Sequence, residues 1–140
     1  MIETISRVLT LKDGKLLLCK ALKGGHYYLP GGHVEFGENA EEALQREMIE
    51  ECGVSLNDIH FIGVFENKWG EPFHHEYNLL YTADIESTDV LSKEEHIAFE
   101  WVEILKLSEI TFYPKEFMDR IAQWAGDKKD IYFSTIAKSK

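Results

Sequence analysis

The chain has 140 residues, of which 44% are hydrophobic, so its length suits one domain, over residues 1–140, with a sizeable core. Its formal net charge is −10 and its basic residues form no cluster longer than a pair, which argues against an extended nucleic-acid surface. The sequence contains neither a leader-like N-terminus nor an apolar run near the ~20 residues of a membrane span, so no membrane role is expected.

The predicted elements begin with a hairpin. Residues 2–11 alternate between apolar and polar, Asp13 and Gly14 suit a turn, and residues 16–20 resume the apolar pattern. A short strand over residues 26–29 leads into a loop with the sequence LPGGHVEFGE, residues 29–38. Asn39 is a suitable N-cap for a helix that we expect to end at Gly53.

The second half of the chain reads as strands followed by a helix. Residues 59–66 and 76–85 favour strands, and the loop between them, residues 67–75, contains Trp69 and Phe73. Residues 97–104 alternate again, and Pro114 suits the first turn of a helix that runs to about Trp124 and stops at Gly126. In the tail, residues 131–133 are expected to pack. This order predicts an α/β fold with helices on the faces of a mixed β-sheet.

The helix over residues 39–53 carries acids on its inner side. A helical wheel gathers its apolar residues in one stripe: Ala43, Leu44, Met48 and Cys52. Glu47 and Glu51 fall inside this stripe and Glu50 lies at its edge, where ionised carboxylates cost several kcal/mol unless they are paired or bind a metal. Arg46 cannot neutralise three glutamates, whereas Mg²⁺ or Mn²⁺ can. A glycine-rich loop before the helix could add a backbone carbonyl to the same ion.

The residues of this loop and helix resemble a known motif. Gly32, then Glu38 after five residues, then REMIEECGV from Arg46 after seven more, is similar at every position to the Nudix box, Gx5Ex7REUxEExGU with U aliphatic. The resemblance implies an α/β/α sandwich, the Nudix fold. It also implies an enzyme that hydrolyses a nucleoside diphosphate linked to another group, by attack of water at phosphorus, with Mg²⁺ or Mn²⁺ as cofactor.

The resemblance also implies roles for individual residues. Glu47, Glu50 and Glu51 match the metal-binding carboxylates, and the carbonyl of Gly31 matches a further ligand. Arg46 and Glu38 match the ion pair that orients the catalytic glutamates.

The general base is left open by the sequence. Glu47 and Glu50 are available within the motif, whereas Glu94, Glu95 and Glu100 lie outside it, just before or on the strand over residues 97–104. We favour Glu95 among the outside candidates, with a solvated loop acid as the alternative.

Four residues are candidates for substrate binding. Lys20 and Arg7 could meet a phosphate, or could be strand cations whose stems pack. Trp69 and Phe73 could stack on a base, or could cover the core. We therefore expect a small nucleotide as the substrate.

Several questions stay open. The sequence does not separate a nucleoside triphosphate from ADP-ribose or a nucleotide sugar as the substrate. A non-catalytic nucleotide-sensing module is the main alternative, although such modules tend to lose glutamates from the motif and this chain has lost none. A homodimer is also left open. Cys19 and Cys52 lie far apart and outside any CxxC motif, so we expect buried, reduced thiols and a cytoplasmic location.

Overall fold

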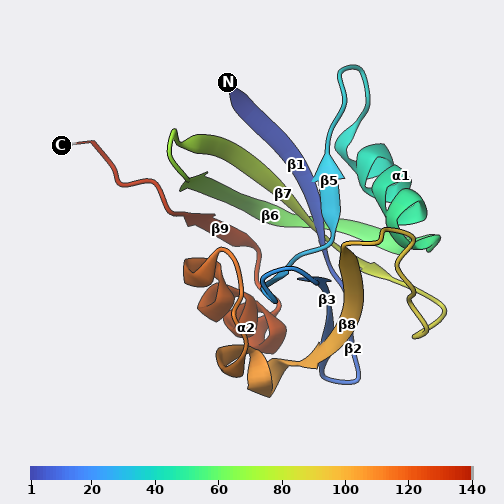
Figure 1. The fold of residues 1–140 in the computed structure, drawn as a ribbon. Coiled ribbons are helices and arrows are strands. Elements are labelled where there is room, and N and C mark those ends of the chain that lie inside the picture. Colours follow the sequence, from blue (N-terminus) through green and yellow to red (C-terminus); the bar gives the residue numbers. More distant parts are fainter. Residues whose placement is uncertain (140) are drawn as a thin grey trace.

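The computed structural model describes residues 1–139 (Figure 1). The first half contains β1 (Ile2–Leu9), β2 (Leu11–Lys12), β3 (Lys15–Ala21), β4 (Tyr27–Tyr28), β5 (Gly31–His33) and α1 (Ala40–Cys52). The second half contains β6 (Asn57–Trp69), β7 (His74–Asp84), β8 (Ile97–Glu103), α2 (Met118–Asp127) and β9 (Ile131–Ser134). Two short 3₁₀ helices, η1 (Ile104–Glu109) and η2 (Lys115–Phe117), lie between β8 and α2.

The strands form two sheets. The larger sheet has the order β5-β1-β7-β6-β9 and is mixed, because β1 runs parallel to β7 but antiparallel to β5, and β6 runs antiparallel to β7 but parallel to β9. The smaller sheet is antiparallel, and β3 pairs with each of its other three strands, β2, β4 and β8. Both the predicted α/β class and the predicted mixed sheet are therefore confirmed.

The two helices cover different parts of the core (Figure 1). Leu44 and Met48 of α1 pack in one buried cluster with Val8 of β1, whereas Ile121 of α2 packs in a second cluster with Leu9. Val8 and Leu9 are neighbours in β1, and neighbouring side chains of a strand point to opposite faces. The helices therefore lie on opposite faces of the larger sheet, as in an α/β/α sandwich.

The helix α1 has the ends and the inner face that the sequence predicts. The Asn39 side chain accepts a hydrogen bond from the backbone N–H of Glu42, and Gly53 ends the helix in the left-handed conformation with φ of 68°. Its buried residues are those of the predicted stripe: Ala43, Leu44, Met48 and Cys52. Local capping and apolar periodicity are therefore sufficient to place this helix.

The first predicted strand is divided between the two sheets. β1 ends at Leu9, and the two residues of β2 pair with β3 around the Asp13-Gly14 turn. The predicted hairpin is therefore correct at its tip and wrong over most of its length, because β1 pairs with β5 and β7 instead. Thr10 lies between β1 and β2, and its carbonyl accepts a hydrogen bond from the N–H of Leu17.

Three other boundaries differ from the prediction. The glycine-rich segment contains β5, a strand that the sequence did not indicate. The loop predicted for residues 67–75 is only four residues long, because the β6–β7 ladder continues to the pair Trp69 and His74. The second helix begins as the 3₁₀ helix η2 after Pro114 and continues through Gly126 to Asp127. The tail forms β9, in which Ile131 is buried.

Two simpler expectations concern membranes and thiols. Among the described residues, none of the helices has the length and apolar character needed to cross a membrane. Cys19 and Cys52 are buried free thiols, as expected, and burial raises the pKa of both. A buried thiol with a raised pKa is a poor nucleophile, so both cysteines act as core residues.

Candidate active site

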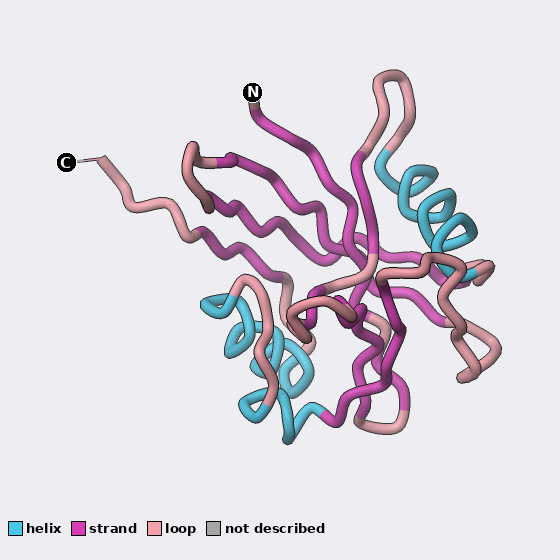
Figure 2. The backbone as a smooth tube through the Cα atoms, viewed as in Figure 1, coloured by secondary structure: helices cyan, strands magenta, loops and turns pink. Residues whose placement is uncertain are grey.

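The glycine-rich segment and α1 form one structural unit. β5 pairs with β1 along the edge of the larger sheet, and residues 34–39 form a loop that leads back to α1 (Figure 2). Asn39 then starts the helix. As a result, β5 packs directly against α1, on the side of the helix that carries Glu47.

Arg46 is the centre of an ion-pair network in this unit. Its Nε and Nη2 donate to the two carboxylate oxygens of Glu38 at 2.7 Å and 3.0 Å. Its Nη1 donates to Glu47 at 2.9 Å and to Glu50 at 3.3 Å, and its Nη2 also donates to the carbonyl of His33. The hydrogen bonds from Arg46 lower the pKa of Glu38 to about 2. One guanidinium therefore ties the loop to the helix and orients two helical carboxylates.

Two glycines allow β5 to approach its neighbours closely. A Cβ atom on Gly32 would lie 2.3 Å from Cδ of Glu47. Gly31 has φ of 143°, and a Cβ atom there would lie 1.9 Å from the carbonyl oxygen of Ser6 in β1. Both contacts are far shorter than van der Waals distances, so a larger residue at either position forces a displacement.

Glu51 is the least satisfied of the helical carboxylates. Its Oε2 is buried and has no hydrogen-bond partner among residues 1–139. Burial, together with the negative charge of Glu47, raises the pKa of Glu51 to about 7. An orphaned hard oxygen beside two further glutamates is suited to a divalent cation. In the described part of the chain, no three His, Cys, Asp or Glu side chains already converge as a metal site, and Glu47 and Glu50 are instead bonded to Arg46.

A pocket of about 640 Å³ lies between the larger sheet and residues 112–117. Its volume is in the range of small-molecule sites. Its aromatic lining includes side chains from several elements: His26, Tyr28, Phe65, Trp69, Phe112 and Tyr113. Its polar lining includes Arg7 from β1, Asn67 from β6, and Glu76 and Asn78 from β7.

Arg7 and Tyr28 connect this pocket to α1. Both side chains line the pocket, and the charge of Glu51 acts on both of them. Burial lowers the pKa of Arg7, while the charges of Glu76 and Glu51 raise it. Burial is also the main reason that the pKa of Tyr28 rises to about 12. No α1 residue is among the pocket's described lining, but the half-buried guanidinium of Arg7 lies within electrostatic range of both Glu76 in the pocket and Glu51 on α1.

Comparison with known proteins decides the family. Residues 3–124 match the model of the NUDIX domain. The chain belongs to the Nudix family. It is thus a Nudix hydrolase, a pyrophosphohydrolase, as the motif indicated.

Relatives of this Nudix hydrolase carry several different names. An ADP-ribose pyrophosphatase of Methanocaldococcus jannaschii is 28% identical over 116 residues, which are 81% of this chain and 69% of that protein. The NAD-capped RNA hydrolase NudC of Mannheimia succiniciproducens is 37% identical over 76 residues, which are 54% of this chain and 27% of NudC. The chain thus spans only about a quarter of the length of NudC.

Solved structures agree on the fold. A MutT Nudix hydrolase from Burkholderia pseudomallei has a TM-score of 0.72 at 22% identity, covering 88% of this chain and 97% of that one. A MutT protein from Methanosarcina mazei Go1 has the same TM-score at 23% identity, covering 92% and 96%. The predicted Nudix fold is confirmed by these likenesses.

Of the four residues predicted to bind substrate in this Nudix hydrolase, two line the pocket and two lie elsewhere. Arg7 and Trp69 line the pocket, whereas Lys20 and Phe73 are not among its described lining residues. Lys20 lies in the smaller sheet, 3.8 Å from the carboxylate of Glu100. Phe73 is exposed in the β6–β7 turn, under the ammonium group of Lys68. Strand pairing, which local sequence does not reveal, determines which of these residues reach the pocket.

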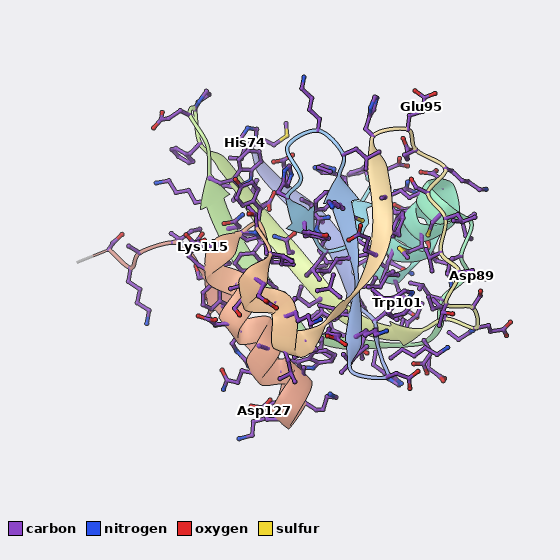
Figure 3. All side chains as sticks on the ribbon, turned by 60° about the horizontal axis from the view of Figure 1, so that its bottom comes forward. His74, Asp89, Glu95, Trp101, Lys115 and Asp127 are labelled. Carbon is purple, nitrogen blue, oxygen red and sulfur yellow. The ribbon has the colours of Figure 1, made fainter. Side chains whose placement is uncertain are left out.

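The three acidic residues outside the Nudix box that were candidates for the general base, Glu94, Glu95 and Glu100, also differ in position. The backbone N–H of Lys93 donates to the carbonyl of Glu51, which fixes the loop before β8 against the end of α1. The charge of Glu94 acts on Glu51 and raises its pKa. Glu95 is exposed and points away from the body of the protein (Figure 3). Glu100 accepts a hydrogen bond from the hydroxyl of Tyr27.

Sequence reasoning missed several residues that line the pocket. Tyr28, Glu76, Asn78 and Phe112 come from three separate parts of the chain. One signal for two of them was present: Glu76 and Asn78 occupy alternate positions of a strand that continues to the buried Leu80. Alternate residues of a strand share one face. Polar residues on the same face as a core residue therefore indicate that this face extends from the core into a binding site.

We expect Arg46→Lys to lower kcat/KM about 10- to 100-fold, the usual cost of losing a residue that orients metal ligands. A lysine has one ammonium group, so it cannot bond both oxygens of Glu38 while also holding Glu47 and Glu50. Steady-state kinetics on the best substrate would measure the loss. Arg120→Lys is the matched control, because Arg120 bonds the carbonyl of Asp130 near the end of α2. An unchanged rate for Arg46→Lys would contradict the orienting role.

Proposed function

We propose that this Nudix hydrolase cleaves the pyrophosphate bond of a small nucleotide, a nucleoside triphosphate or a related compound, by attack of water at phosphorus. The observation that carries the proposal is the pocket of about 640 Å³, because it is lined by Arg7 and Tyr28, on both of which the charge of Glu51 acts. Aromatic side chains in its lining, including Tyr28 and Trp69, offer flat surfaces on which a base can stack. A base in this pocket would leave the phosphates near the carboxylates of α1.

The chain supplies residues for each part of this reaction. Glu47, Glu50 and Glu51, with the carbonyl of Gly31, would hold Mg²⁺ or Mn²⁺, which when bound polarises a phosphoryl group and lowers the pKa of a water molecule. Arg46 keeps Glu47 and Glu50 in position through the bonds described above. Arg7, a half-buried cation that lines the pocket within electrostatic range of Glu51, is suited to a phosphate oxygen.

The protein surface is consistent with capture through a cation. The net charge of the protein is −10, which repels a free polyphosphate. Capture by protein side chains alone is therefore less favourable than capture through a cation. The α1 carboxylates would add to this repulsion unless a divalent cation neutralised them. A divalent cation held by these carboxylates would therefore assist substrate binding as well as the chemical step.

The two loop acids before β8 can be separated by mutation. We expect Glu94→Gln to lower kcat about tenfold or more, because the charge of Glu94 acts on Glu51 at the proposed centre. Glu95→Gln is its matched neighbour, because Glu95 is the candidate for the general base that the sequence favoured among the acids outside the motif. A loss of kcat confined to Glu95→Gln would support Glu95 as the general base, whereas a loss confined to Glu94→Gln would assign that role to Glu94. The pH dependence of kcat should be measured for both variants.

A substrate panel tests the proposed function directly. It should contain nucleoside triphosphates, oxidised triphosphates, ADP-ribose, nucleotide sugars and dinucleoside polyphosphates, each with Mg²⁺ and with Mn²⁺. We expect a nucleoside monophosphate among the products of the best substrate. Binding of nucleotides without turnover of any panel member would instead support the non-catalytic alternative.

ADP-ribose is the second candidate substrate. It is favoured by the likeness to the ADP-ribose pyrophosphatase of Methanocaldococcus jannaschii, which covers 81% of this chain. ADP-ribose also contains the base and pyrophosphate that the proposed site accepts. Its kcat/KM relative to the best triphosphate decides between the two candidates.

A further inference from the structure

A buried carboxylate lines the pocket without a complete set of partners. Glu76 is 9% exposed and comes from β7. Its Oε1 accepts long hydrogen bonds from the side-chain amides of Asn67 at 3.4 Å and Asn78 at 3.3 Å. Oε2 has no hydrogen-bond partner among the residues that the structure describes, and it is not one of their fully buried unpaired atoms, so it is open to the pocket. A ligand that enters the pocket displaces water from this oxygen, and because an unpaired carboxylate oxygen is costly, such a ligand meets a strong demand for a donor.

The neighbouring side chains cannot easily meet that demand. Asn78 Oδ1 accepts from Arg7 Nε at 3.2 Å, and Asn67 Oδ1 accepts from the hydroxyl of Thr135 at 2.9 Å. These bonds keep both amide NH₂ groups directed at Glu76 Oε1. Arg7 also donates to the carbonyl of Leu29 at 2.8 Å. The surrounding network therefore holds Glu76 as an acceptor and leaves its second oxygen for a ligand.

The other lining residues indicate what kind of ligand brings the donor. Tyr28, Trp69 and Phe112 provide aromatic surfaces in the same pocket, which suits a flat heterocycle. Adenine, cytosine and guanine carry an exocyclic NH₂ group that can donate to a carboxylate. Uracil carries a carbonyl oxygen where cytosine carries this group, and hypoxanthine carries one where adenine does, and a carbonyl oxygen would repel a carboxylate. Where guanine carries its amino group, hypoxanthine has only a C–H, which offers no comparable donor.

We propose that Glu76 is a specificity-determining residue that selects nucleotides whose base carries an exocyclic amino group. The proposal rests on the proposed function, because it names the base that the pocket accepts. Glu76 accepts a hydrogen bond from the amino group through Oε2, while Asn67 and Asn78 hold Oε1. A base without the amino group would take water from this oxygen and offer no amino donor in its place, and is therefore rejected.

The test compares triphosphates with counterparts that lack the amino group: CTP with UTP, ATP with ITP, and GTP with ITP. We expect the best substrate of the wild-type enzyme to carry the amino group and to exceed its counterpart about 10- to 100-fold in kcat/KM. Glu76→Gln should reduce that preference to a few-fold at most, because its amide can turn a donor toward a carbonyl. Glu66→Gln is the matched control, since Glu66 bonds Ser134 outside the described pocket lining.

Two results would overturn the proposal. One is equal turnover of both members of each pair by the wild-type enzyme, a comparison that requires no variant to fold. The other is a Glu76→Gln variant that folds and keeps the full preference.

A binding measurement separates this inference from the proposed function. Calorimetry in EDTA would compare the binding of CMP with that of UMP, AMP with IMP, and GMP with IMP. It examines the pocket in the absence of metal and of hydrolysis. Tighter binding of the amino member by the wild-type protein would support the role of Glu76 even if the enzyme hydrolysed no triphosphate. Equal binding within every pair, or no binding of any monophosphate, would overturn that role even if triphosphates were hydrolysed.

Discussion

Replacing Glu51 with glutamine should lower kcat by roughly 10³-fold while leaving the fold intact. The substitution keeps the size of the side chain but removes its charge, so a divalent cation loses one of its proposed anionic ligands. Metal assistance of this kind contributes several kcal/mol to the transition state, and each 1.36 kcal/mol corresponds to a factor of ten. Turnover of the best substrate with Mg²⁺ and with Mn²⁺ measures the loss, and circular dichroism reports on the fold.

The same variant should make the metal-free protein more stable at high pH. Burial and the charge of Glu47 raise the pKa of Glu51 to about 7 in the folded state, above its ordinary value of 4.5. A carboxyl with a raised folded-state pKa favours folding when protonated, and this contribution is lost as the pH rises from 4.5 through about 7. In EDTA, the difference in melting temperature between Glu51→Gln and wild type should therefore be larger at pH 8 than at pH 5.

Glu42→Gln provides the control for both measurements. Glu42 lies in the first turn of the same helix, but its side chain is exposed and away from the stripe that packs on the sheet. Its removal should change neither turnover nor the pH dependence of melting. Near wild-type turnover in Glu51→Gln would show that Glu51 is not a metal ligand, whatever the outcome of the melting experiments.

The carboxylate half of the site could be predicted from sequence because its order is local. Asn39 and Gly53 bound α1 through capping, and the helical period places Glu47 and Glu51 beside Leu44 and Met48. The partner of Arg46 is also nearby in sequence, since Glu38 lies on the loop that immediately precedes the helix. Spacing along one helix and one loop therefore carried most of the information.

The set of residues that line the pocket could not be predicted from sequence, because the register of strand pairing determines which side chains meet there. Asn78 meets Arg7 only because β1 pairs in parallel with β7, in a register that joins Ile5 to Asn78. Phe112 reaches the pocket beside β4, where residue 112 forms an isolated bridge to Tyr27. Such pairings depend on residues far apart in the chain, so periodicity within one segment does not reveal them.

A similar argument explains the missed strand β5. Its sequence, Gly31-Gly32-His33, has neither the β-branched residues nor the alternation that normally indicate a strand. The strand exists because β1 offers a free edge and because glycine lets β5 approach both Ser6 and Glu47. The residues that made the segment resemble a loop are therefore the ones that the close packing requires.

Gly32→Ala should lower kcat at least 100-fold without unfolding the protein. The added Cβ would lie 2.3 Å from Cδ and 2.5 Å from Oε2 of Glu47, so the flexible Glu47 side chain must move away. A displacement of about 1 Å in a catalytic group can cost about 10²-fold. Gly31→Ala is a less informative change, because its Cβ would meet the Ser6 backbone and disturb the β1–β5 pairing itself. Turnover and melting temperature should be measured together.

A double variant shows whether this loss passes through Glu47. In Glu47→Ala protein the obstructing carboxylate is absent, so adding Gly32→Ala should cause little further loss of turnover. If the two losses instead multiply, Gly32 acts independently of Glu47 and the proposed displacement is wrong. Gly126→Ala is the control, because a Cβ atom there meets nothing within 4 Å. Since Glu47 also bonds Arg46 at 2.9 Å, Gly32→Ala together with Arg46→Lys should likewise cost less than the product of the two single losses.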